Sequence, residues 1–194
     1  MDKLAVINRN LTASIELKTK TLQDEAMMAN VVAIADQLIA TYRNGGKVLF
    51  CGNGGSAADA QHLAAELSGR YYYDRPPLNS EALHVNTSYL TAVANDYSYD
   101  HVYARMMEAI GEKGDVLVGL STSGNSANVV NAFIEAKKQG CITVGFTGQG
   151  GGALKEHSDH LIAIDSTNTP RIQELHMLIG HSLCELIEQA IFPK

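Results

Sequence analysis

The sequence predicts an α/β fold, in which helices cover both faces of a parallel sheet and a long helical extension precedes it. The first observation behind this prediction is that short apolar runs alternate with segments whose apolar residues recur every three or four positions. The second is that residues 3–43 show this helical spacing before any apolar run, until Gly45 and Gly46 end it. No Pro-rich linker or charge block divides the 194 residues. We therefore expect one domain over residues 1–194, with residues 1–44 as the helical extension.

A strand–turn–helix unit occurs twice, with the same order of residue types each time. A short apolar run is followed by a polar turn that contains glycine and then by an amphipathic segment, at residues 47–68 and again at residues 115–139. Ligands bind beyond the carboxyl ends of the strands in such sheets, so we expect both turns, 52–56 and 121–126, at the ligand site. In chain order, the predicted strands cover residues 47–51, 82–85, 115–120, 141–146 and 159–164, a Gly-rich turn covers 147–152, and the predicted helices after the first strand cover 57–68, 127–139 and 169–191.

The composition excludes several classes of protein. The formal net charge of −6 argues against a nucleic-acid groove built on basic residues. No stretch approaches the roughly 20 apolar residues that a membrane span needs, and the N-terminal segment lacks the apolar core of a signal peptide. Three widely separated cysteines without a CxxC pair are typical of small buried side chains in a reducing compartment. We therefore expect a cytoplasmic protein that binds neither nucleic acid nor membrane.

The turn at residues 121–126 predicts a phosphate site. Its sequence, Ser-Thr-Ser-Gly-Asn-Ser, places four hydroxyl groups immediately before a predicted helix. The unpaired N–H groups and the positive dipole end of a helix N-terminus suit a phosphate, and hydroxyl groups add further donors. The alternative is an ordinary helix cap, for which one residue such as Asn125 or Ser126 is enough. Four hydroxyl groups exceed that need and favour the phosphate.

The turn at residues 52–56 is less specific. Its sequence, Gly-Asn-Gly-Gly-Ser, lacks the GK[ST] of a Walker loop and the GxGxxG spacing of a dinucleotide-binding fingerprint. By itself it is explained equally well by a tight connection between a strand and a helix and by a ligand-binding loop.

Ionisable residues on two predicted helices could form a metal site. His62 and Glu66 are four residues apart and share one helix face, although this spacing is also common in solvated surface pairs. The last helix adds Gln173 and His181, residue types that are more often core or interface groups when they occur alone. Imidazole and carboxylate groups bind zinc, but Gln173 and His181 are eight residues apart, about 12 Å along a helix. One ion reaches both only if the side chains extend far or a second subunit supplies one of them, which points to a site at an oligomer interface.

Five segments together resemble the sugar isomerase (SIS) domain family, and the resemblance covers nearly the full length of the chain. The segments are CGNGGS at 51–56, HLAAELSGR at 62–70, AND at 94–96, STSGNS at 121–126 and RIQELH at 171–176. The resemblance implies a three-layer sandwich in which helices flank a five-stranded parallel sheet. It also implies a homotetramer with its active sites at subunit interfaces.

The resemblance further implies roles for individual residues. Glu66 and His181 are the expected catalytic acid–base pair. A zinc ion, one per subunit, is expected on His62, Glu66, Gln173 and His181. Substrate contacts are expected from both polar turns and from a few residues outside them, namely Asn53, Gly54, Gly55, Ser56, Glu66, Arg70, Asn95, Asp96, Ser121, Thr122, Ser123, Ser126 and Gln173.

Within the family, the chain is most similar to members that convert sedoheptulose 7-phosphate to D-glycero-D-manno-heptose 7-phosphate through an enediolate, an early step toward ADP-heptose and the lipopolysaccharide core. This resemblance implies a sugar-phosphate substrate and isomerase activity. The alternative is a non-catalytic family member that binds the replication initiator or senses a sugar phosphate. Positions 66 and 181 discriminate between these functions, because Glu66 and His181 have the acid–base capacity that isomerisation requires.

Overall fold

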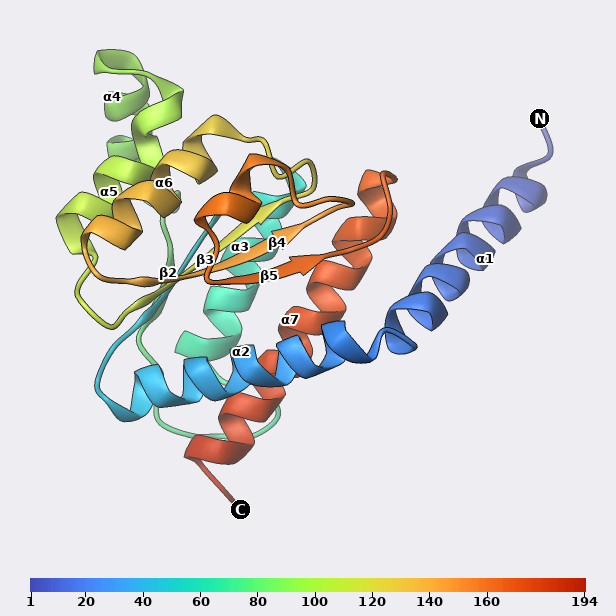
Figure 1. Ribbon diagram of the computed structural model, residues 1–194, viewed down its shortest axis with the longest axis horizontal. Helices are drawn as coiled ribbons and strands as arrows, with labels where there is room; N and C mark the ends of the chain where they lie inside the picture. The colour runs from blue at the N-terminus through green and yellow to red at the C-terminus, as the bar shows by residue number, and fades with distance from the viewer.

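The computed structural model describes all 194 residues and contains a five-stranded sheet in which every pair of neighbouring strands is parallel. Helices cover the two faces of this sheet, so the predicted three-layer α/β fold is confirmed (Figure 1). In spatial order the strands are β2 (Ser80–Ala82), β1 (Val48–Gly52), β3 (Val116–Ser121), β4 (Ile142–Thr147) and β5 (His160–Ala163).

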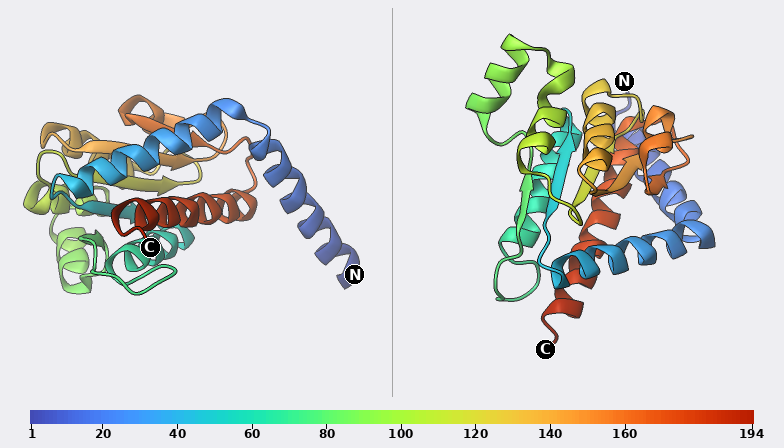
Figure 2. Two further views of the ribbon diagram at one scale, coloured as in Figure 1. Left: turned by 90° about the horizontal axis from the view of Figure 1, so that it is seen from below. Right: turned by 60° about the vertical axis from the view of Figure 1, so that its left-hand side comes forward.

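The helices divide between the two faces, and each face has its own apolar core. One core joins the sheet to α2 (Glu25–Arg43), α3 (Gly55–Ser68) and α7 (Thr169–Ile191). The other joins it to α4 (Thr87–Asp96), α5 (Val102–Ile110), α6 (Ala127–Lys138) and the short turn η2 (Gly152–His157). Another short turn, η1 (Tyr99–His101), connects α4 to α5. In the two views of Figure 2, α7 lies between α2 and α3.

The strands are apolar on both sides because they are covered on both sides. Every residue of β1 and β3 is buried, and successive residues contribute to opposite cores. Phe50 packs with the α2–α3–α7 layer, whereas its neighbour Leu49 packs with the α4–α5–α6 layer. A continuous apolar run is the pattern expected of a parallel strand buried on both faces, which explains why the sequence revealed these strands.

The predicted single helix over residues 3–43 is wrong in one respect, because the structure has two helices there. The first, α1 (Lys3–Leu22), ends at Gln23, and Asp24 caps the start of α2 by accepting a hydrogen bond from the Met27 amide. Figure 1 shows α1 projecting away from the sheet layers, while α2 runs across them. Helical spacing continues across the break, so only the acidic cap at Asp24 marked it in the sequence.

The segment between the second and third strands also departs from the expectation. The second strand covers Ser80–Ala82 and meets the predicted run 82–85 only at its first residue, because the chain turns after Ala82. Two helices, α4 and α5, follow in a region for which the apolar pattern gave no element. None of the helices combines the length and the apolar character needed to cross a membrane.

The strand order determines where a ligand fits. The chain passes from β1 to β2 on one side and then places β3 on the other side of β1. The order therefore reverses between β1 and β3, and such a reversal opens a crevice at the carboxyl ends of the two strands. The two polar turns that the sequence singled out follow these two strands.

Candidate active site

Three ionisable side chains converge from two helices. His62 and Glu66 lie one turn apart on α3, with 3.0 Å between His62 Nε2 and Glu66 Oε1. His181 reaches them from α7, and its Nε2 is 3.2 Å from His62 Nε2. One ligand atom from each of the three lies within 4.8 Å of the others. We refer to these residues as the His–Glu–His cluster.

The cluster forms because α7 and α3 approach closely beside it. Gly180, the residue before His181, packs against Leu63, the residue after His62. A Cβ atom at position 180 would lie 2.6 Å from Leu63 Cδ1, closer than real side chains come. The missing side chain at Gly180 therefore brings the helices together where their ionisable residues need to meet.

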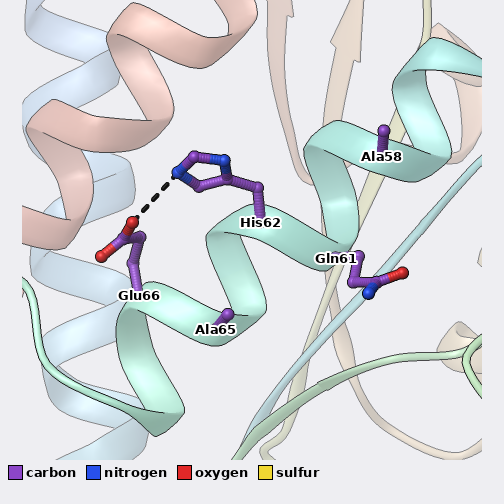
Figure 3. A pocket seen from close by; sticks show the side chains of 5 residues that line it. All are labelled: Ala58, Gln61, His62, Ala65 and Glu66. Atoms are coloured by element: carbon purple, nitrogen blue, oxygen red, sulfur yellow. Dashed lines mark ion pairs between the residues drawn. The ribbon is translucent and has the colours of Figure 1, made fainter.

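The cluster is open to solvent on one side. It borders a hollow of about 430 Å³ lined by Ala58, Gln61, His62, Ala65 and Glu66 (Figure 3). In this view His62 and Glu66 extend from the same side of α3, and Gln61 points away from them. Burial lowers the pKa of His181, neighbouring His62 lowers it further, and Glu66 opposes these effects only in part. His181 therefore favours its neutral form, which has a lone pair for a proton or a metal ion.

The three side chains fit a zinc ion by both donor type and spacing. Two ligands in a tetrahedral zinc site lie about 3.3 Å apart when each bond is 2.0–2.1 Å. The His–Glu–His cluster has separations of 3.0 and 3.2 Å between neighbouring donor atoms. The fourth predicted ligand, Gln173, lies apart from the cluster in this chain, and its amide is 3.5 Å from Ser56 Oγ. Three of the four predicted ligands thus meet within one chain.

The serine loop, residues 121–126, has its hydroxyl groups turned toward one another. Ser121 Oγ is 3.0 Å from Ser126 Oγ and 3.5 Å from Ser123 Oγ. The simple helix-cap interpretation is not supported, because the Ser126 side chain makes no capping hydrogen bond to α6. The Asn125 side chain accepts a hydrogen bond from the Ala153 amide instead. The first amides of α6 therefore remain available beside a group of hydroxyls.

The serine loop interlocks with the turn that follows β4. Gly124 has a φ of 67°, and a side chain there would collide with the backbone carbonyl of Gly151. The Gly148 amide donates to the Thr122 carbonyl at 3.0 Å, and the Leu154 amide donates to the Gly124 carbonyl at 2.9 Å. Backbone contacts thus hold most of the loop in shape, and the Ser123 hydroxyl adds one contact by accepting a hydrogen bond from the Asn125 amide at 3.1 Å.

The glycine loop, residues 52–56, leads into α3 and is held by a reciprocal amide pair. Asn53 Nδ2 donates to Asn128 Oδ1 at 2.8 Å, and Asn128 Nδ2 donates to Asn53 Oδ1 at 2.9 Å. The Tyr99 hydroxyl adds a third hydrogen bond, to Asn53 Oδ1 at 3.2 Å. The pair links the start of α3 to the start of α6, so the two loops face the same crevice.

Other expected substrate contacts lie farther out. Asn95 and Asp96 are exposed at the end of α4 and bond to each other, from Nδ2 to Oδ1 at 3.0 Å. Arg70 is exposed after α3. None of these three makes a hydrogen bond or an ion pair with the His–Glu–His cluster or with the two loops in this chain.

The sequence did not identify two residues that shape the site. Asn128 is buried, and its contact with Asn53 joins distant parts of the chain, so no local pattern revealed it. Tyr71 lies with its ring 5.7 Å from the ring of His181. It belongs to an irregular segment, for which no periodicity predicts a position.

Known proteins with similar sequences and structures share one family. A family model described as SIS domain matches residues 12–148. The phosphoheptose isomerase of Sulfurimonas denitrificans is 47% identical over 186 residues, which cover 96% of this chain and 95% of that protein.

Two solved structures have nearly the same fold over the full chain. A phosphoheptose isomerase from Francisella tularensis superposes with a TM-score of 0.92 at 36% identity, covering 97% of this chain and 100% of the other. One from Neisseria gonorrhoeae superposes with a TM-score of 0.90 at 39% identity, covering 96% of this chain and 98% of the other.

Proposed function

The chain belongs to the SIS domain family and groups with its phosphoheptose isomerases, and from this premise we propose that it converts sedoheptulose 7-phosphate to D-glycero-D-manno-heptose 7-phosphate. The observation that carries this proposal is the convergence of Glu66 and His181 from α3 and α7, two helices that pack against each other. An aldose–ketose isomerase needs both a proton carrier and a phosphate anchor. Glu66 lies on α3, the helix that follows the glycine loop, and the serine loop follows β3.

The proton transfer is assigned to Glu66. Moving the carbonyl from C2 to C1 requires removal of a proton from C1, formation of an enediolate, and return of a proton to C2. Glu66 Oε1 faces His62, whereas no hydrogen bond within the chain engages Oε2. We assign the carbon-bound proton to this free oxygen. Burial lowers the pKa of His181, so that its neutral imidazole is favoured, and we assign to it the movement of protons between the sugar oxygens.

The phosphate group is assigned to the serine loop. The hydroxyls of Ser121, Thr122, Ser123 and Ser126 and the first amides of α6 supply donors without adding a formal charge. Asn53, Gly54, Gly55 and Ser56 bind the middle of the sugar, and Arg70, Asn95, Asp96 and Gln173 complete its contacts in the assembled protein.

Zinc is proposed on His62, Glu66 and His181, with Gln173 of a neighbouring subunit as the fourth ligand. A bound zinc ion supplies a Lewis acid that polarises the substrate carbonyl. The proposal rests on the donor types and spacing of the His–Glu–His cluster and on the separation of Gln173 from it in a single chain.

A homotetramer with sites at subunit interfaces is proposed because α1 leaves apolar side chains uncovered. Leu4, Ile7, Leu11 and Ile15 form a stripe on α1 and are 55–65% exposed. Soluble monomers rarely tolerate so long an apolar surface, and closed symmetry is the usual way to cover it. Polar contacts fix α1 to the start of α7, including Ser14 Oγ to Glu174 Oε2 at 2.7 Å, so packing of α1 acts on the helix that carries Gln173.

A cytoplasmic location and a role in supplying heptose for the lipopolysaccharide core are proposed with this activity. The alternative function is a non-catalytic SIS protein that binds the replication initiator or senses a sugar phosphate. Neither role requires a carboxylate and two imidazoles at hydrogen-bond distance, so the His–Glu–His cluster favours the isomerase.

The deciding experiment is turnover of sedoheptulose 7-phosphate by the purified protein, with and without a chelator. The proposal expects turnover, loss of activity after chelation, and recovery when zinc is returned. Binding of the sugar phosphate without turnover in the zinc-loaded protein would establish the sensor function instead.

A further inference from the structure

A buried ion pair lies close to the His–Glu–His cluster but is not part of it. Arg75 Nε donates to Glu188 Oε1 at 3.0 Å, and each side chain is only 1% exposed. Removing two charges from water costs more than most buried pairs return, so such a pair is a poor source of stability by itself. This cost prompts the question of what else the pair does.

Arg75 binds the end of the helix that carries Glu66. Its guanidinium donates to the backbone carbonyls of Glu66 and Leu67, each at 2.8 Å, and to that of Gly69 at 3.2 Å. The last carbonyls of a helix have no partner within the helix, and a cation there also favours the helix dipole. Arg75 thus fixes the C-terminal turn of α3 through the carbonyl of the proposed base.

Glu188 fixes two further parts of the same site. It lies on α7, two turns beyond His181, and so connects the end of α3 to the second helix of the cluster. Its carboxylate also accepts hydrogen bonds from the Tyr71 and Tyr72 amides at 2.9 and 2.8 Å. These bonds hold the segment that places the Tyr71 ring 5.7 Å from that of His181.

The pair is charged under ordinary conditions. Burial raises the pKa of the Glu188 carboxyl, but the two tyrosine amides and Arg75 lower it by more, so the net pKa lies below its ordinary value. The ionised carboxylate therefore accepts the hydrogen bonds from Tyr71, Tyr72 and Arg75 at neutral pH.

We propose that Arg75 and Glu188 are positioning residues that set the relative placement of α3, α7 and Tyr71, and thereby the spacing of the His–Glu–His cluster. The inference rests on the proposed function of the cluster and extends it to two residues that contact neither metal nor substrate. The pair acts on Glu66 through its backbone carbonyl, and it acts on His181 through α7 and the Tyr71 ring.

The test separates placement from stability by replacing both charges together. The double variant Arg75→Met with Glu188→Leu removes both charges and keeps apolar volume, so that neither charge is left buried alone. Readouts are the unfolding temperature of the zinc-free protein, zinc affinity by competition with a chelator, and kcat and KM. Residues that orient metal ligands typically change metal affinity or activity 10–100-fold. We expect a folded protein with a lower unfolding temperature, because the carbonyls at the end of α3 and the two tyrosine amides lose their partners. We also expect zinc affinity weaker by about tenfold or more, and a fall in kcat that exceeds the rise in KM.

A second variant provides the test if the double variant does not fold, and a control variant shows whether the effect is specific to the pair. Glu188→Gln retains the shape and one acceptor oxygen, so it serves if the double variant does not fold, and it should weaken zinc binding in the same direction. Tyr73→Phe removes hydroxyl contacts to the backbone carbonyls of Glu188 and Phe192 and leaves the side-chain contacts of the pair in place, so it should leave zinc affinity unchanged.

Wild-type zinc affinity and wild-type kcat in a folded double variant would overturn the proposal. The same result in folded Glu188→Gln would also overturn it. A wild-type protein without isomerase activity would instead reject the proposed function, and the zinc affinities would still decide the role of the pair.

Discussion

Glu66 is the residue on which the proposed chemistry depends most. Glu66→Gln keeps the shape of the side chain but removes its capacity to accept a proton. We expect kcat to fall by about a hundredfold or more, the usual scale for general acid–base catalysis. The measurement is steady-state turnover, with Glu135→Gln on the opposite face of the sheet as the matched control. Near-normal turnover would remove Glu66 from this role.

The serine loop predicts a different kinetic signature. Ser121→Ala combined with Ser123→Ala removes hydroxyls that face one another and leaves the backbone contacts of the loop in place. Because hydrogen bonds to a charged group contribute about 1.5–3 kcal/mol each, KM should rise about tenfold or more while circular dichroism stays normal. Ser158→Ala, outside the loop, is the control. An unchanged KM with a normal spectrum would contradict the phosphate assignment.

His176 predicts a pH dependence of stability. Burial lowers the pKa of this side chain from 6.5 to about 4, and the hydrogen bond from its ring to the Thr147 carbonyl opposes the shift only in part. The unfolded chain therefore binds this proton first as pH falls. The contribution of neutral His176 to the free energy of unfolding is fully present above pH 6.5 and is lost as pH falls from 6.5 to about 4. The total loss is about 3 kcal/mol.

Urea unfolding at a series of pH values tests this dependence. The free energy of unfolding of the wild type should fall more steeply than that of His176→Gln between pH 6.5 and about 4. Parallel profiles for the two proteins would show that His176 does not titrate in this way.

At the scale of elements, the close approach of α7 and α3 depends on Gly180. Gly180→Ala places a Cβ atom 2.6 Å from Leu63 Cδ1, and such overpacking typically costs about 1–3 kcal/mol. Adding Leu63→Ala opens space for that methyl group. The free energy of unfolding of the double variant should therefore be higher than the value expected from adding the losses of the two single variants. Denaturant titrations of the four proteins measure this coupling. Additive effects would mean that the two helices do not limit each other at this point.

The sequence predicted those elements whose patterns reflect local burial. Strands β1, β3, β4 and β5 were found within a residue or two because their runs are mainly apolar, and β1 and β3 are buried throughout. The region of α4 and α5 was missed because both helices are short, 10 and 9 residues, so that few turns repeat the apolar spacing. The break at Asp24 was missed because both helices continue the same spacing.

The candidate site was predicted only where a local pattern along one helix was sufficient. His62 and Glu66 could be paired from their spacing along one helix. His181 reaches these two residues only because α7 crosses α3, and the residue pattern of a single sequence does not predict that crossing. Arg75 and Asn128 act by contacts between distant segments, so their positions gave no local signal.

At the scale of the whole molecule, the separation of Gln173 from the His–Glu–His cluster predicts a pattern of complementation. Glu66 and His181 meet within one chain, so mixed assemblies of Glu66→Gln and His181→Ala should remain inactive. Mixed assemblies of Glu66→Gln and Gln173→Ala should regain activity in part, because an intact cluster can receive Gln173 from a neighbour. The assay follows co-refolding, with light scattering to verify the tetramer.

Two outcomes would contradict this arrangement. Recovery in the first mixture would mean that Glu66 and His181 of different subunits serve one site. A fully active monomer in light scattering would remove the need for any second subunit.

The contact between His62 and His181 also orders the events of folding. It joins residues 119 positions apart, whereas the backbone contacts that hold the serine loop join residues 26 positions apart (Thr122 and Gly148) and 30 positions apart (Gly124 and Leu154). Closing a long loop is slow, because its entropy is lost before the contacts it permits are gained. We therefore expect a refolding molecule to assemble the serine loop early and the His–Glu–His cluster late. In that interval the proposed phosphate site would exist before the proposed base is in place.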